Sequence, residues 1–256
     1  MINNIFLLSH QDDEMGVFNH IENIVKKREN IVIFYLTNGS IKKRIDKDFI
    51  FNRDLESIKV LNKLGVSEDK IVFLGRKLEI NVYKLHENLQ KTYKYLNDFI
   101  KNLNGESNIF THSNEGGNTD HDSCFYLVKK LINNSSNIKT CYQFSLYNNY
   151  NLPFYFYSVM KPLKKNGNII KSKINFFQKI KYSILLFKYT SQIHIWIGLF
   201  PMVIFRIFMN QYGSLQLIDN SLNIDKPYNN LLWYEKRKFI TFDKFKKIIE
   251  LFFQEK

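Results

Sequence analysis

The run Ile5-Phe6-Leu7-Leu8, followed at once by Ser9-His10-Gln11-Asp12-Asp13-Glu14, decides the fold. A short continuous apolar run is typical of a strand that is buried on both faces of a parallel sheet. The polar and ionisable run after it has no apolar rhythm and predicts a loop. Apolar spacing then predicts a helix over residues 17–27 and a second buried strand over residues 31–36. Strand, helix and strand in this order predict a βαβ unit, whose crossover is expected to be right-handed.

The alternation of strands and helices continues through the first 150 residues. Further helices are expected over residues 51–64, 83–103 and 122–132, and further strands over residues 71–74, 108–111 and 139–146. This order predicts an α/β fold with a Rossmann-like, doubly wound and mainly parallel sheet. We expect residues 1–150 to form this core. Residues 151–256 are expected to form a helical and irregular C-terminal extension that packs on the core within the same single domain.

Length and composition exclude several classes of protein. The 256 residues can bury a large core, and an apolar content of 45% excludes a disordered chain. Two cysteines, Cys124 and Cys141, are too few for a secreted disulfide scaffold. The N-terminus lacks the basic and apolar regions of a signal peptide, so we expect a cytoplasmic protein. A formal charge of +13 favours anionic partners somewhere on the surface.

The extension differs from the core in its amino-acid composition. Residues 151–181 are rich in Tyr, Phe, Lys and Asn, and residues 193–208 are the most apolar part of the chain. Pro201 and Arg206 interrupt this apolar run, which is shorter than the roughly 20 residues of a membrane-spanning helix. We favour a buried helix that covers the sheet. The alternative is an aromatic, Lys-flanked surface that contacts an anionic membrane, at its inner face, or a lipid-linked substrate.

Two ionisable clusters follow predicted strands at the edge of the sheet where ligands bind. One follows residues 5–8, and the other follows residues 108–111. Ligands of an open parallel sheet bind beyond the carboxyl ends of its strands. His10 and Asp13 in the first cluster and His121 in the second can therefore converge on one cation. Two imidazoles and one carboxylate leave open positions for water, which is the pattern of a catalytic zinc site and also suits ferrous iron.

Asp12 lies next to these residues and need not bind the metal itself. Its carboxylate could hydrogen-bond a metal-activated water and take its proton, which is the role of a general base and favours hydrolysis. A histidine and two aspartates after a strand could instead simply cap the following helix. Spacing alone favours the two interpretations about equally.

Four segments resemble, in order, the motifs of the PIG-L/LmbE-like deacetylases. Residues 9–14 are similar to the family's His-Pro-Asp-Asp-Glu signature, and residues 117–121 resemble its Gly-His-Pro-Asp-His element. Thr37-Asn38-Gly39 resembles a strand end of the family, and Arg53-Asp54-Leu55-Glu56 resembles its Arg-x-x-Glu helix. Together these segments span about the first 125 residues. Beyond residue 150, only Tyr189-Thr190-Ser191-Gln192 is similar to a family feature.

The resemblance implies a fold, an activity and a set of site residues. The family consists of zinc enzymes with a Rossmann-like fold that remove N-acetyl groups from glucosaminyl compounds. By this resemblance, His10, Asp13 and His121 hold the metal and Asp12 is the base. Arg53 is implied to grip the sugar or an attached anionic group, whereas the alternative is an ion pair with Glu56 on the same helix face.

The chain departs from the family pattern at two positions. Gln11 replaces a proline, which removes a fixed φ angle but leaves the ligands intact. Asn118 stands where the family usually has a histidine that steadies the oxyanion or protonates the leaving amine. An amide can donate a hydrogen bond to an oxyanion but cannot deliver a proton at neutral pH. Asp12 would then serve as base and afterwards as acid, or His112 would substitute, or the enzyme would be slow or inactive.

We therefore expect a zinc-dependent deacetylase that acts on an N-acetylated amino sugar, free, lipid-linked or within a glycan precursor. The alternative is a carbohydrate- or anion-binding protein that keeps the fold and has lost catalysis through Asn118. A nucleic-acid partner is not expected, because no recognised binding motif is present and the lysines are dispersed.

Overall fold

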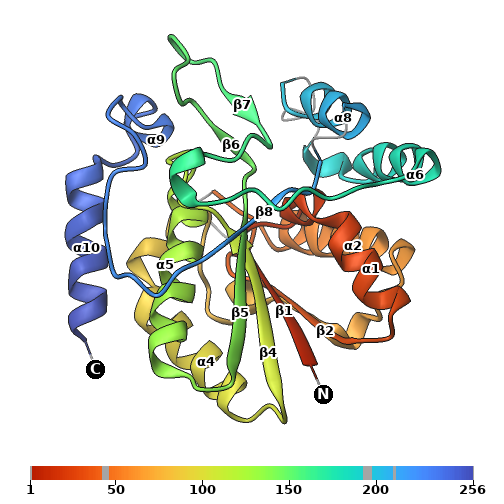
Figure 1. Ribbon diagram of the computed structural model, residues 1–256, viewed down its shortest axis with the longest axis horizontal. Helices are drawn as coiled ribbons and strands as arrows, with labels where there is room; N and C mark the ends of the chain where they lie inside the picture. The colour runs from red at the N-terminus through yellow and green to blue at the C-terminus, as the bar shows by residue number, and fades with distance from the viewer. Residues whose placement is uncertain (1, 42–45, 193–197, 210–211, 256) are drawn as a thin grey trace.

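The computed structural model describes residues 2–41, 46–192, 198–209 and 212–255, which form a six-stranded central sheet, a small two-stranded sheet and flanking helices (Figure 1). The strands are β1 (Ile2–Leu8), β2 (Asn30–Tyr35), β3 (Ile71–Val72), β4 (Glu106–His112), β5 (Ile138–Phe144), β6 (Tyr147–Asn148), β7 (Ser158–Val159) and β8 (Leu215–Leu217). The strand order of the central sheet is β3-β2-β1-β4-β5-β8. All neighbours in this sheet are parallel except β8, which runs antiparallel to β5. This confirms the predicted doubly wound, mainly parallel α/β fold.

Helices cover both faces of the central sheet. They are α1 (Phe18–Lys26), α2 (Lys47–Lys63), α3 (Leu74–Lys77), α4 (Leu89–Lys101), α5 (Thr119–Asn134), α6 (Phe176–Leu186), α8 (Phe200–Phe208), α9 (Trp233–Lys236) and α10 (Phe242–Gln254). Within the described ranges, no helix has both the length and the apolar character that are needed to cross a bilayer.

Side chains of β1 alternate between two separate hydrophobic cores. Phe6 and Leu8 pack in a core with α1, α2, α6 and α8, whereas Ile5 and Leu7 pack in a core with α4, α5 and α10. Figure 1 shows α4, α5 and α10 on one side of the sheet and α1 and α2 on the other. Because β1 is buried on both faces, its sequence is apolar without interruption, as the parallel arrangement requires.

The extension contributes to the central sheet as well as covering it. The short strand β8 pairs with β5, with Gln143 opposite Gln216. The amphipathic tail helix α10 packs Phe245 and Ile249 into the second core. The division of the chain at residue 150 stays a prediction.

The described part of the long apolar run packs on the core with only one of its faces. Residues 193–197 lie outside the described residues, and α8 covers only the end of the run. In α8, Val203 and Ile207 are buried, but Phe205 and Phe208 are exposed. The favoured interpretation therefore holds for one face of α8, which packs on the core, whereas the other face is open to solvent.

Candidate active site

The site lies where two loops meet at the carboxyl ends of β1 and β4. The first loop leads from β1 into a 3₁₀ turn, Asp13–Gly16, and the second leads from β4 into α5. Strands β2 and β4 flank β1, so the helices that follow β1 and β4 cover opposite faces of the sheet and leave a crevice between the two loops. Gly117 permits a close approach of the second loop to β6, because a Cβ at this position would lie 1.9 Å from the carbonyl oxygen of Tyr147.

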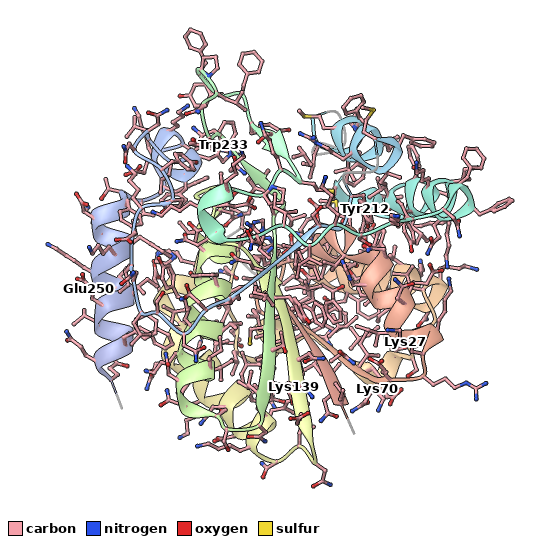
Figure 2. The ribbon with its side chains drawn as sticks, viewed as in Figure 1. Lys27, Lys70, Lys139, Tyr212, Trp233 and Glu250 are labelled. Carbon is pink, nitrogen blue, oxygen red and sulfur yellow. The ribbon has the colours of Figure 1, made fainter. Side chains whose placement is uncertain are left out.

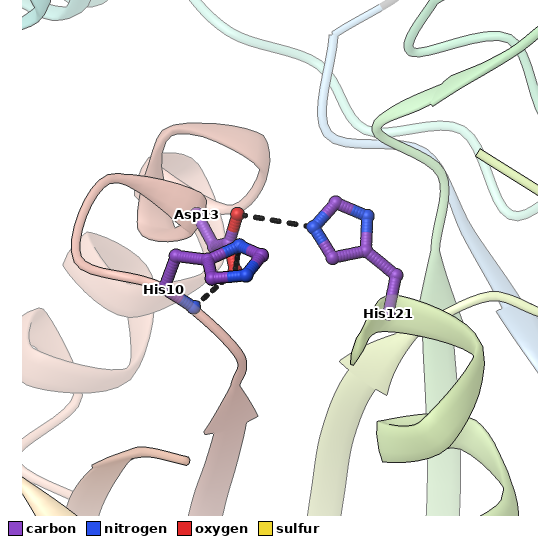
Figure 3. Close-up of side chains that lie close together, drawn as sticks. All are labelled: His10, Asp13 and His121. Carbon is purple, nitrogen blue, oxygen red and sulfur yellow. Dashed lines mark hydrogen bonds and ion pairs between the residues drawn. The ribbon is translucent and has the colours of Figure 1, made fainter. Parts of the chain in front are cut away.

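The three predicted ligands converge across this crevice. One ligand atom from each of His10, Asp13 and His121 lies within 4.8 Å of the other two, and all three side chains are buried. His10 Nδ1 lies 3.4 Å from Asp13 Oδ2, and His121 Nε2 lies 3.4 Å from Asp13 Oδ1. Figure 3 shows the first two residues on the loop after β1 and His121 reaching them from the start of α5.

This donor set fits a divalent metal ion. Both ring nitrogens of His121 are buried, and neither has a hydrogen-bond partner among the described residues. A buried imidazole nitrogen without a partner loses its hydration without compensation, and a metal ion would restore it. Two imidazoles and one carboxylate are common ligands of zinc and also suit ferrous iron. The structure therefore brings together residues that could hold such an ion.

Further side chains orient the three ligands. Asp13 Oδ2 accepts hydrogen bonds from Ser9 Oγ at 2.8 Å and from the backbone N–H of His10 at 2.6 Å. On the far side of His10, its Nε2 lies 3.0 Å from Asp120 Oδ2. Burial alone would lower the pKa of His10, but the carboxylates of Asp13 and Asp120 outweigh this and raise it to about 10. A carboxylate behind a ligating histidine fixes the orientation of its ring.

Asp120 is itself held by the backbone of a loop that the sequence analysis did not predict. Its two carboxylate oxygens accept hydrogen bonds from the backbone N–H groups of Tyr83 at 2.6 Å and Leu85 at 3.0 Å. Tyr83 adopts a positive φ of 64° to present its N–H in this way. Residues 83–88 are therefore not part of the α-helix. Leu85–Glu87 form a separate 3₁₀ turn, and the helix predicted from residue 83 begins only at Leu89.

His112 lies behind the ligands and not at the open side of the site. Its ring is fully buried and stacks on His121 with a centroid distance of 4.1 Å and an interplanar angle of 3°. Burial and the neighbouring imidazole of His121 lower the pKa of His112 to about 4. Its ring is neutral at pH 7, which argues against His112 as a substitute proton donor.

Asp12 lines the open side of the site and has an unusual backbone. Its φ of 139° lies in a region that favours glycine, and its N–H donates to Glu14 Oε2 at 3.0 Å. Asp12 Oδ1 lies 3.3 Å from Arg53 Nη2. Burial raises the pKa of Asp12 to about 7, although the guanidinium of Arg53 opposes this rise. The loop thus presents an additional carboxylate beside the three ligands.

Arg53 is bound to the loops of the site and not to Glu56. Its Nη1 donates to Gly39 O at 2.7 Å, and its Nη2 donates to Gln11 O at 2.6 Å. Glu56 instead accepts from Thr190 Oγ1 at 2.7 Å and from Ser191 Oγ at 2.6 Å. The ion pair between Arg53 and Glu56 is therefore wrong as an alternative. The substrate role of Arg53 stays a prediction.

The motif at residues 189–192 joins the extension to the core beside the site. Tyr189 donates from its hydroxyl to Glu14 Oε1 at 2.8 Å, and the two residues after it bind Glu56. Gln192 accepts from Arg53 Nε at 2.8 Å in the amide orientation that satisfies both of its polar atoms. A motif that is only weakly similar to the family pattern therefore holds three charged residues at or beside the site, Glu14, Glu56 and Arg53.

Asn118 has two partners within the protein. Its side-chain oxygen caps α5 by accepting from the N–H of Asp120 at 2.8 Å, and its Nδ2 donates to the hydroxyl of Tyr147 at 3.1 Å. The ring of Tyr147 packs edge-on against His121 at a centroid distance of 5.3 Å. Glu115 holds the backbone of this tyrosine through its N–H at 3.0 Å. Sequence reasoning missed Tyr147 because it lies on strand β6, 26 residues beyond His121 of α5.

A cavity of about 220 Å³ opens over these residues. All six predicted site residues line it, together with several aromatic and polar residues that were not predicted as site residues. These additional residues include Tyr83, Tyr147, Tyr157, Gln192, Trp233 and Arg237. The mixture of aromatic rings with a few polar groups is typical of a site for a small polar ligand.

Comparisons with solved structures find the same fold in several deacetylases. The zinc-inhibited form of teicoplanin deacetylase Orf2 is 13% identical, with a TM-score of 0.62 over 86% of this chain and 100% of that chain. The A40926 pseudoaglycone deacetylase Dbv21 is 14% identical, with a TM-score of 0.60 over 86% and 99%. The N,N'-diacetylchitobiose deacetylase from Pyrococcus horikoshii is 14% identical, with a TM-score of 0.59 over 85% and 84%.

Sequence comparison identifies the family. No curated protein matches the chain in sequence. Residues 5–132, half of the chain, match the family model of PIG-L, GlcNAc-PI de-N-acetylase. This segment contains both strand-end loops, the three metal-ligand candidates, Asp12, Arg53 and Asn118. The chain belongs to the PIG-L family of GlcNAc-PI de-N-acetylases.

Proposed function

We propose that this chain is a metal-dependent hydrolase that removes the acetyl group from an N-acetylated amino sugar. The observation that carries the proposal is the convergence of His10, Asp13 and His121 at a cavity, with the carboxylate of Asp12 beside them. Membership of a deacetylase family and the fold shared with deacetylases of sugar and glycopeptide compounds support the same reaction. The zinc-inhibited form of one neighbour supports a divalent metal, for which we propose zinc.

His10, Asp13 and His121 would hold the ion. When bound, zinc supplies Lewis acidity to the acetamide carbonyl and to a water molecule, whose pKa falls toward about 7. Asp120 keeps His10 in the orientation that leaves Nδ1 facing Asp13. Ser9 and His112 neighbour Asp13 and hold its carboxylate between the two loops.

Asp12 is the proposed general base. It takes the proton of the attacking water and returns it to the departing amine, so that one carboxylate serves both halves of the reaction. Arg53 holds Asp12 through its guanidinium while its other donors bind the backbone of Gln11 and Gly39. We also retain Arg53 as a contact of the sugar or of an attached anionic group, since it lines the cavity.

Asn118 and Tyr147 form the proposed oxyanion contact. The amide of Asn118 donates to the hydroxyl oxygen of Tyr147, and no described side chain accepts the hydroxyl proton of Tyr147 in turn. This proton can therefore be donated to negative charge that develops on the acetyl oxygen. The pair replaces the function that a histidine has in the family pattern.

The deciding experiment compares Asp12→Ala with the parent protein. The variant is expected to lose acetate release from N-acetylglucosamine derivatives by about 10²–10⁴-fold while its bound metal stays near one ion per chain. Asp69→Ala, at an exposed position with a side chain 68% accessible, is the matched control. Normal deacetylation by the Asp12 variant would refute the base assignment. Elemental analysis of the parent distinguishes zinc from iron.

One observation favours a second candidate function, a carbohydrate- or anion-binding protein without turnover. Both polar groups of the Asn118 side chain are already engaged, and an amide cannot deliver a proton to the amine. Calorimetric binding of N-acetyl sugars by the metal-loaded protein, with no acetate released, would support this candidate. Acetate release that requires metal would exclude it.

A further inference from the structure

Helix α6 has two apolar faces, of which only one packs on the protein. Tyr182, Leu185 and Leu186 are buried in the first core. On the opposite side, a stripe at helical spacing is open to solvent. Its members are Phe177, Ile180 and Ile184, with exposed fractions of 81%, 39% and 55%. A helix that is satisfied by its core contacts does not need this second stripe.

Two neighbouring segments repeat the pattern. Helix α8 packs against α6 and exposes Phe205 at 60% and Phe208 at 44% on the side away from its buried residues. The hairpin between β6 and β7 exposes three consecutive aromatic residues at its tip. These are Phe154, Tyr155 and Phe156, with exposed fractions of 80%, 64% and 65%. We call these exposed residues of α6, α8 and the hairpin the aromatic face.

The aromatic face lies at the same end of the molecule as the cavity. Figure 1 shows the hairpin, α8 and α6 beyond the carboxyl ends of the parallel strands, and Figure 2 shows side chains standing out from all three. Tyr157 of the hairpin and Leu199, which precedes α8, line the cavity. Large apolar patches on the surface of a folded protein are typical of interaction sites.

The charge around this face indicates the kind of partner. Residues 123–218 contain no Asp or Glu at all, although the chain has 24 acidic residues elsewhere. The segment from residue 151 to residue 209 carries a set of basic residues instead. They are Lys161, Lys164, Lys165, Lys171, Lys173, Lys179, Lys181, Lys188 and Arg206. The segment that forms the aromatic face therefore carries positive charge that no acidic residue of the same segment balances.

We propose that the aromatic face docks on the surface of an anionic lipid bilayer. Aromatic and aliphatic side chains enter the boundary between headgroups and acyl chains, and lysines beside them bind the anionic headgroups. The segment that forms the face contributes no carboxylate of its own, and the Glu22 carboxylate beside α6 is nearly buried and paired with Lys181, so little negative charge would repel an anionic surface. A protein partner would not require a segment that carries basic residues and no acidic ones. Because the cavity shares walls with the docking elements, its opening would lie next to the bilayer.

Co-sedimentation with vesicles tests the proposal without any turnover, so its outcome is independent of the proposed deacetylase activity. The vesicles are phosphatidylcholine alone and an equimolar mixture with phosphatidylglycerol. The parent protein is expected to bind the mixed vesicles at low salt and to bind less at high salt. It should bind phosphatidylcholine alone much more weakly. No binding to the mixed vesicles at low salt would overturn the proposal.

Two variants separate the apolar and the electrostatic contributions. Phe177→Ser combined with Phe205→Ser is expected to weaken vesicle binding by about tenfold or more, because two exposed rings no longer enter the bilayer. Lys171→Glu combined with Lys173→Glu is expected to weaken binding mainly at low salt, by about tenfold. Leu251→Ser, on α10 and 60% exposed, is the matched control and should bind like the parent.

Two further outcomes would overturn the proposal. One is an equal loss of binding in the Leu251 control and in the phenylalanine variant. The other is a parent protein that self-associates through the aromatic face, seen as a dimer in sedimentation velocity that the phenylalanine variant abolishes, while neither protein binds vesicles. Circular dichroism and the unfolding midpoint establish that each variant is folded.

Discussion

Glu22 offers a sharp test of how the extension is held to the core. This residue of α1 is nearly buried and accepts hydrogen bonds from three residues of α6. Gln178 Nε2 donates at 2.8 Å, Lys181 Nζ at 2.7 Å and the Tyr182 hydroxyl at 2.7 Å. Glu22→Gln keeps the size of the side chain but removes its charge. We expect the variant to be less stable than the parent at pH 7.

The magnitude follows from the pKa of Glu22. Burial alone would raise this pKa, but the hydrogen bonds from Gln178, Lys181 and Tyr182 outweigh it and lower the pKa from 4.5 to about 2. A difference of this size corresponds to roughly 3 kcal/mol. Lys181 and a second ion-pair partner, Lys26, are partly exposed and screened by solvent, which reduces the expected loss to about 1–2 kcal/mol. The folded-state pKa is depressed, so this stability is present above pH 4.5 and is lost as the pH falls toward 2.

Urea unfolding of parent and variant from pH 7 down to pH 4 measures this effect. The difference in unfolding free energy is expected to be constant near neutral pH and to begin shrinking below about pH 5. Glu250→Gln removes an exposed carboxylate that lies 3.9 Å from Lys246 on α10, and it should change stability by less than about 0.5 kcal/mol. Equal stability of the Glu22 variant and the parent at pH 7 would refute the reasoning, as would a difference that grows on acidification.

Three other changes test the site. Tyr147→Phe keeps the ring beside His121 but removes the hydroxyl, and kcat for acetate release should fall by about 10²–10³-fold with little change in KM; an unchanged kcat would exclude the oxyanion contact. Asn118→His should raise the rate if the native site lacks an acid, which steady-state assays across pH will show. Chelation of the metal should abolish turnover and lower the unfolding midpoint, because an ion at 1,000 times its Kd stabilises the folded state by about 4 kcal/mol; a midpoint that chelation leaves unchanged would contradict metal binding by His10, Asp13 and His121.

Strands that carry uninterrupted apolar runs were predictable from the sequence. The predicted strand over residues 31–36 corresponds to β2, and the predicted strand over residues 108–111 lies within β4. Parallel strands buried on both faces leave a plain local signal. The two strand-end clusters were predictable for the same reason, since each follows such a run.

Interactions that depend on tertiary structure were not predictable. The helix start at residue 83 was wrong because the backbone of Tyr83 turns away to bind Asp120, a contact over 37 residues. Tyr147 reaches Asn118 only because Glu115 fixes the start of β6. The exposed side of α8 has the same composition as a buried one. The sequence could show that α8 carries apolar residues on two sides. It could not show which of these sides lacks a neighbour in the folded protein.

The left-handed backbone of Asp12 has a consequence for how this site can change over time. Holding a residue other than glycine at a φ of 139° costs on the order of 1–3 kcal/mol, which the rest of the fold must offset. Glycine at this position would relieve that cost and at the same time delete the carboxylate. Selection for thermal stability alone would therefore favour glycine at position 12 and remove the proposed base. A protein that keeps aspartate here retains the carboxylate at a cost in folding free energy.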